Sequence, residues 1–202
     1  MGDLVKIPFK IENRGGNECG YPCLNWFYDG LRYEAILDTG ADNNLFPFQF
    51  LKLLSQSGVV DLDEIYTQNK FFTSSGVGGS MSTTHPILLK IELRLNSSVF
   101  LNLMINFCIP PDKMAYDCYM NDQLRLPKLE NDLMIVRDTK LKQKFMDDYN
   151  RIKKNIQKFN PPFLFGKPFI SKLEHVKFVI NNEMANKDSY FEFIVKDSCI
   201  VA

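Results

Sequence analysis

The chain has 202 residues, which suits one domain or one domain with a sizeable insertion. Hydrophobic residues make up 45% of it and include 17 Phe, so a packed core is expected and intrinsic disorder is excluded. Basic and acidic side chains number 24 each, a balance that points to neither a nucleic-acid nor a membrane partner. With no signal-peptide pattern and no run approaching a membrane span, we expect a cytoplasmic or otherwise intracellular protein.

The cysteines do not follow a metal-site pattern. They are Cys19, Cys23, Cys108, Cys118 and Cys199. Two of them could in principle bind zinc with His85 or His175, but there is no Cys-x-x-Cys or His-x-x-x-His spacing to support such a site. We therefore expect reduced cysteines, no bound metal and no cofactor.

The first third of the chain predicts strands followed by helix. Residues 4–11 roughly alternate apolar with polar and predict a strand, at a sheet edge because of Pro8. Residues 24–28 and 32–37 flank Asp29-Gly30, a two-residue turn signal, and predict a β-hairpin. Pro47 suits a helix start, so the sequence predicts a short helix that Gly58 stops and a further turn or two over 61–68.

The middle of the chain changes character at Pro110-Pro111. Before it, residues 70–90 predict a hairpin with a glycine-rich tip, and 87–93 and 99–109 predict two further strands. After it, within a long stretch from Lys128 to Phe159, apolar residues recur every three or four positions from Leu129 to Ile156. This spacing predicts one or two helices, in a helical insertion over about 110–160. The basic cluster Arg151, Lys153, Lys154 and Lys158 is interpreted as a solvated face.

The last segment returns to strand-like patterns. Phe163 to Phe165 predicts a strand, and a short helix follows with Pro168 in its first turn. Residues 175–181 and 189–196 predict a closing hairpin.

Three short motifs stand out as a candidate site. An apolar run ends abruptly in Asp38-Thr39-Gly40-Ala41, which places a carboxylate at the tip of a strand. The hairpin tip reads Gly76-Val77-Gly78-Gly79, and Leu164-Phe165-Gly166-Lys167 follows the insertion. Any β protein can contain a strand ending in an Asp-Gly type of turn, so the first motif alone does not define a function.

Together, and in this order, the motifs resemble those of the retropepsins, the retroviral type of aspartic protease. The resemblance covers roughly residues 24–109 and 161–180. It implies a mainly β, acid-protease half-barrel with helical insertions at about 47–68 and 110–160, in a single domain spanning 1–202 with a β core at about 4–109 and 161–202. It also implies an aspartic endopeptidase that cleaves polypeptide substrates.

The same resemblance assigns roles to individual residues. Asp38 would be the catalytic acid or base, Thr39 would bond across a dimer axis, and Gly40 and Ala41 would shape the loop. Asp42 would accept hydrogen bonds from substrate amides, beneath a flap formed by Gly76, Val77, Gly78 and Gly79. Leu164, Gly166 and Lys167 would support the loop, and Lys167, standing where Arg is usual, would pair with Asp42. Because Ala41 cannot donate a hydrogen bond to the carboxylate as Ser could, we expect activity at mildly rather than strongly acidic pH.

Only one Asp-Thr-Gly occurs in the chain. Hydrolysis by this chemistry needs two carboxylates that share a proton, so the second must come from another copy of the chain. The sequence therefore predicts a homodimer with Asp38 of each subunit at the axis. The alternative is a catalytically silent dimer of the same fold that acts as a peptide-binding or scaffolding module.

Overall fold

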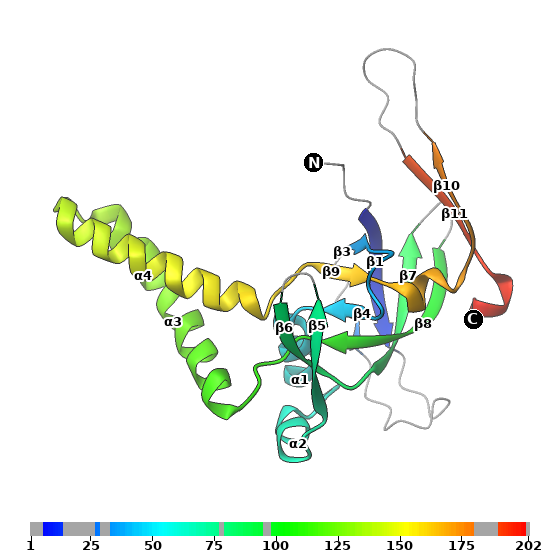
Figure 1. Cartoon of the computed structure of the whole chain (residues 1–202), viewed down its shortest axis with the longest axis horizontal. Coiled ribbons are helices and arrows are strands. Elements are labelled where there is room, and N and C mark those ends of the chain that lie inside the picture. The colour runs from blue at the N-terminus through cyan, green and yellow to red at the C-terminus, as the bar shows by residue number, and fades with distance from the viewer. Residues whose placement is uncertain are drawn as a thin grey trace, which may run out of the picture.

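A computed structural model describes residues 6–13, 27–28, 33–76, 79–94, 98–179 and 190–200. A curled β-sheet forms the body, a long pair of helices projects from one side, and a two-stranded hairpin projects from another (Figure 1). The chain is thus a mixed α/β protein built around a curled sheet. None of the described helices is both long and apolar enough to cross a membrane.

The main sheet has seven strands in the order β2-β1-β3-β9-β4-β8-β7, and β7 also pairs with β1, so the sheet curls until it meets itself. Its strands are β1 (Lys6–Asn13), β2 (Phe27–Tyr28), β3 (Tyr33–Leu37), β4 (Asn44–Phe46), β7 (Ile87–Arg94), β8 (Ser98–Phe107) and β9 (Phe163–Phe165).

Strand β9 lies between β3 and β4, although more than a hundred residues separate it from both. It runs parallel to β3, with Ile36 opposite Leu164, and antiparallel to β4, with Leu45 opposite the same Leu164. The loop between β3 and β4 therefore passes around the end of β9. This arrangement brings Asp38 and Gly166 together.

Aromatic side chains fill the core beneath the loop. Phe46, Phe107 and Phe165 have no solvent exposure, and Phe46 packs edge-on against Phe107 with ring centroids 5.8 Å apart. Burying a phenyl ring stabilises a fold by about 1.5–3 kcal/mol, so these residues anchor β4, β8 and β9. Helix α1 (Phe48–Gln56) adds the buried Phe48, Phe50, Leu51 and Leu54 to the same core.

Two short helices and two separate hairpins complete the body. After α1, Gly58 has a positive φ of 71°, and Asp61 caps α2 (Leu62–Thr67) by accepting a hydrogen bond from the Glu64 amide. The first hairpin pairs β5 (Phe71–Gly76) with β6 (Gly79–Thr84), and the second pairs β10 (Leu173–Val179) with β11 (Tyr190–Val195). A four-residue helix, α5 (Lys167–Ile170), follows β9, and a 3-10 turn, η2 (Asp197–Cys199), follows β11.

The projecting pair, here called the α3–α4 arm, consists of α3 (Lys113–Ile135) and α4 (Thr139–Lys158). Asp112 and Asp138 cap the two helices, each by accepting a hydrogen bond from a backbone amide three residues on. Helix α3 continues through Pro127, which is exposed, so the carbonyl group that loses its helical partner there lies near water. The predicted helical insertion is present, and α3 begins well before the Leu129 repeat that indicated it.

The predicted hairpin between residues 24–28 and 32–37 is wrong. Strands β2 and β3 both pair antiparallel with β1, with Tyr28 opposite Glu12 and Ala35 opposite Ile7. The apolar pattern predicted where the strands lie, but β2 and β3 each form their backbone hydrogen bonds with β1 rather than with each other. The predicted strands at 87–93 and 99–109 do form an antiparallel pair, as do those of the closing hairpin; residues 180–189 at its tip lie outside the described part of the chain.

Candidate active site

The Asp38 loop begins where β3 ends. The Asp38 amide donates a hydrogen bond of 2.9 Å to the Phe165 carbonyl, which extends the β3–β9 pairing by one residue. The chain then turns, with the Ala41 amide donating to the Asp38 carbonyl at 3.2 Å. The Asp38 carboxylate is only partly buried, and its Oδ1 accepts a hydrogen bond of 2.9 Å from the Gly40 amide. The turn thus fixes the carboxylate while Thr39 and Gly40 remain exposed.

Gly166 packs against this loop more closely than any other residue type would permit. A Cβ atom built on Gly166 would lie 2.4 Å from the Asn43 carbonyl oxygen and 2.6 Å from that of Ala41. Both obstacles are backbone atoms that no side-chain rotation moves. The next amide, that of Lys167, donates to the Ala41 carbonyl at 2.9 Å. The end of β9 therefore supports the loop by direct backbone contact.

Asn44 completes the support, and the sequence analysis did not single it out. Its side chain has no solvent exposure; Oδ1 accepts from the Gly166 amide at 2.9 Å, and Nδ2 donates to the Met104 carbonyl at 3.0 Å. The side-chain amide of Asn44, on β4, is thus hydrogen-bonded both to β8 and to the turn after β9. The available signal in the sequence was a polar residue directly before Leu45-Phe46 in a short strand. A buried amide at such a position needs hydrogen-bond partners, so it indicates a structural contact.

The implied ion pair between Lys167 and Asp42 is present. Lys167 Nζ lies 2.5 Å from Asp42 Oδ1, and both side chains are largely exposed. The hydrogen bond from the Lys167 ammonium group, together with its charge, lowers the pKa of Asp42 below its usual 3.8. Asp42 is therefore held in its ionised form and is already paired with Lys167.

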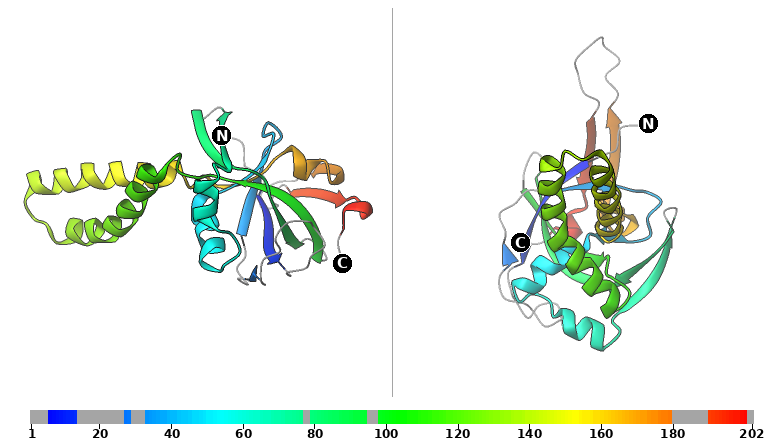
Figure 2. Two further views of the ribbon diagram at one scale, coloured as in Figure 1. Left: turned by 90° about the horizontal axis from the view of Figure 1, so that it is seen from below. Right: turned by 90° about the vertical axis from the view of Figure 1, so that its left-hand side faces the viewer.

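The β5–β6 hairpin, which the resemblance assigns as a flap, is regularly paired. Its register runs regularly from Phe71 opposite Thr84 to Gly76 opposite Gly79, while Val77 and Gly78 lie outside the described residues. The base of the hairpin is fixed to the sheet: the Ile109 amide donates to the Ser82 carbonyl at 2.9 Å, and the Phe107 amide donates to Thr84 Oγ1 at 3.1 Å. Both views in Figure 2 show the hairpin and the Asp38 loop projecting from the same side of the sheet.

The structure thus brings together eight of the predicted site residues at the ends of β3 and β9: Asp38, Thr39, Gly40, Ala41, Asp42, Leu164, Gly166 and Lys167. The glycines of the hairpin come from a separate element. Among the residues that the structure describes, no three His, Cys, Asp or Glu side chains gather as a metal site. Burial raises the pKa of Cys108 to about 12, so its thiol is inert at neutral pH, and Cys19 and Cys23 lie outside the described part of the chain.

No protein-family model matches the sequence, and neither the curated proteins nor the solved structures include a significant match to this chain. Any functional assignment therefore depends on the residues and their geometry.

Proposed function

We propose that this chain is a retropepsin-like aspartic endopeptidase that acts as a homodimer. The observation that carries the proposal is the support of the Asp38-Thr39-Gly40 turn. Backbone bonds from Phe165 and Lys167 and the close approach of Gly166 hold the turn, while the Asp38 carboxylate reaches the surface.

The chemistry requires a second carboxylate. The nearest acidic residue in the same loop, Asp42, is paired with Lys167 and is held ionised, so it is a poor partner for sharing a proton. A second copy of the chain would supply its own Asp38, and the exposed Thr39 and Gly40 would lie at the axis between the two loops. Two carboxylates so close cannot both be charged, and the pair would retain one proton.

In the dimer, the ionised Asp38 would remove a proton from a water molecule as that water attacks the scissile carbonyl carbon. The protonated Asp38 of the other subunit would donate its proton toward the carbonyl oxygen. The β5–β6 hairpin would cover an extended substrate, which could pair by its main chain between the hairpin and the loop.

The test is cleavage of an unstructured protein such as casein across the acidic to neutral range, with the mass of the native protein measured in the same buffers. Asp38→Asn retains the size of the side chain and removes the acid. Asp63→Asn, an equally conservative change at an exposed carboxylate on α2, is the matched control.

We expect cleavage by a dimer that Asp38→Asn abolishes, that Asp63→Asn leaves unchanged and that pepstatin-type inhibitors block. A dimer that never cleaves would favour the silent binding module instead. A strict monomer that cleaves would overturn the shared-carboxylate mechanism.

A further inference from the structure

One face of α4 carries most of the positive charge of this helix. Five exposed cations are spaced three, four or seven residues apart and therefore lie along one side, here called the basic stripe; they are Lys140, Lys144, Arg151, Lys154 and Lys158. The apolar positions, including the fully buried Ile152, lie on a different side of the helix. At about 1.5 Å per residue, the basic stripe is about 27 Å long.

Helix stability does not account for the basic stripe. Lys140 with Lys144, and Lys154 with Lys158, are like-charge pairs four residues apart, which destabilise a helix. Lys140 also lies in the first turn, where the helix dipole disfavours a cation. Acidic and basic residues that alternate along such a line would be typical of a solvent-exposed helix stabilised by salt bridges, and the stripe does not alternate in this way.

Acidic neighbours offset only part of this charge. Asp147 lies on the line of the basic stripe and accepts a hydrogen bond from Gln143 at 2.9 Å, and Asp148 beside it pairs with Arg151 at 3.1 Å. The four lysines of the stripe form no salt bridge with any residue that the structure describes. A surface depression at the C-terminal half of the stripe is lined by Arg151, Lys154 and Lys158 together with Asn155 and Gln157.

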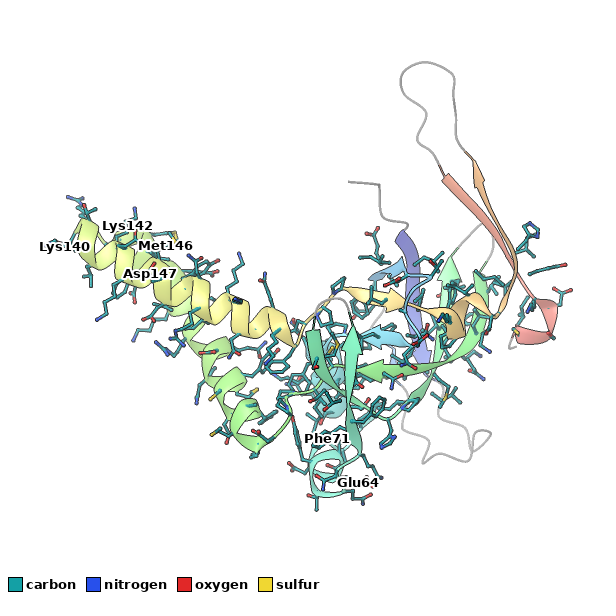
Figure 3. The ribbon with its side chains drawn as sticks, in the orientation of Figure 1. Glu64, Phe71, Lys140, Lys142, Met146 and Asp147 are labelled. Carbon is teal, nitrogen blue, oxygen red and sulfur yellow. The ribbon has the colours of Figure 1, made fainter. Side chains whose placement is uncertain are left out.

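The α3–α4 arm presents this face on a fixed support. At its base, Tyr119 Oη accepts hydrogen bonds from Gln123 and Asn160, and Asn160 also accepts one from the Gln49 amide on α1. Lys52 of α1 donates to Gln123 at 2.7 Å. From this anchored base the arm extends away from the sheet, with Lys140 and Lys142 at its free end (Figure 3).

The distribution of charge along the chain indicates the kind of partner. Helix α4 contains seven Lys or Arg and two Asp, a net charge of +5, while the whole chain has 24 of each sign, which leaves −5 on the remainder. A polyanion longer than the stripe, such as a nucleic acid, would extend past α4 toward the rest of the chain, whose net negative charge would repel it. A short acidic segment would meet α4 alone, since charges are screened beyond about 8–10 Å at physiological salt.

We propose that the basic stripe binds an acidic segment of another polypeptide. An extended segment of about eight residues would match the length of the stripe. The depression at Arg151, Lys154 and Lys158 would accept side-chain carboxylates of that segment. This site lies on the arm and does not depend on the proteolytic function proposed for the sheet.

The test compares two charge-reversal variants of the full chain. Lys144→Glu with Lys154→Glu changes the basic stripe, whereas Lys142→Glu with Lys153→Glu changes two other exposed lysines of α4 and alters the net charge by the same amount. The probe is a fluorescein-labelled peptide of about ten alternating Glu and Ser residues, followed by fluorescence anisotropy at about 50 mM and about 150 mM salt. Thermal unfolding verifies that each variant is folded, and Lys144→Ala with Lys154→Ala replaces the first variant if it is not.

We expect the wild-type chain to bind the peptide, the stripe variant to bind it about tenfold or more weakly, and the control variant to remain within about threefold of wild type. An equal loss in both variants would show general attraction to a basic helix and would overturn the proposal. Absence of wild-type binding at the lower salt concentration would also overturn it. Tighter binding of a thymidine oligonucleotide with the same number of negative charges would assign the stripe to nucleic acid instead.

Discussion

Lys167 Nζ lies 2.5 Å from Asp42 Oδ1, so the residue that follows Gly166 is joined to the Asp38 loop by charge as well as by backbone hydrogen bonds. The two residues are 125 positions apart in the sequence. Because both side chains are exposed, water and salt weaken the pair, and its contribution to stability is small.

The pair makes a small part of the stability depend on pH. Its ammonium group lowers the pKa of Asp42, so the stabilisation is present above the usual value of 3.8 and is lost as the pH falls through the lower, folded-state value. Lys167→Met should slightly lower the midpoint of thermal unfolding at neutral pH, and the difference from wild type should vanish well below pH 3.8. Lys167→Arg, which retains the charge, is the control, and a pH-independent difference would assign the effect to packing.

Gly166→Ala should destabilise the fold and abolish any activity. The new Cβ would collide with the carbonyl oxygens of Asn43 and Ala41, at a cost on the order of 3 kcal/mol in urea unfolding. Gly58→Ala is the matched control. Its φ of 71° imposes a cost of about 1 kcal/mol, but nothing lies within 4 Å of the added atom and the site is distant in the sequence. Equal costs at the two glycines would contradict the close packing of Gly166 against the loop.

Asn44→Ala should loosen the Asp38 loop. It leaves the Gly166 amide and the Met104 carbonyl without partners, at a cost of about 2–4 kcal/mol. Asn106→Ala removes another buried amide, which donates to the Thr84 carbonyl at 2.9 Å, and should cost about 1–3 kcal/mol without affecting the loop.

Hydrogen exchange separates the two asparagine variants. Peptides that cover residues 38–45 and 164–168 should exchange faster in Asn44→Ala than in Asn106→Ala under conditions where both proteins are folded. Similar exchange in the two variants would mean that Asn44 adds only general stability. The measurement does not require that the protein be active.

Cys108 should make the protein less stable in alkali. Burial raises the pKa of its thiol from 9.0 to about 12, so the folded state retains a proton that the unfolded chain releases. The stabilisation that the protonated thiol gives to the folded state is therefore full below about pH 9 and declines as the pH rises toward 12. In Cys108→Val, the fall in unfolding free energy between about pH 8 and about pH 10.5 should be smaller by about 1–2 kcal/mol. Cys118→Val is the control, because solvent reaches Cys118 in the folded chain. If the unfolding free energy of Cys108→Val fell as much as that of the wild type, the prediction would be contradicted.

Local patterns predicted most of the elements. The alternation in β1, the glycine that ends α1 and the regular apolar spacing in α4 are each encoded within a few residues, so they can be read from the sequence. The apolar repeat indicated helix only from Leu129, whereas α3 begins at Lys113 and continues through Pro127, ordinarily a helix breaker, which is tolerated here on an exposed face. The partners of β2 and β3 were predicted wrongly because a turn signal indicates that a chain reverses and does not indicate which edge it joins.

The sequence by itself determined the composition of the candidate site: one Asp-Thr-Gly, one glycine-rich hairpin, and a Gly-Lys after an apolar triplet. Only the tertiary structure decided that β9 lies between β3 and β4, that Gly166 contacts the Asp38 loop and that Asn44 joins three segments. These contacts connect residues from 60 to 125 positions apart. Such pairings arise from packing of the whole chain, because hydrogen bonds and close contacts over that separation have no local periodicity by which a sequence could reveal them.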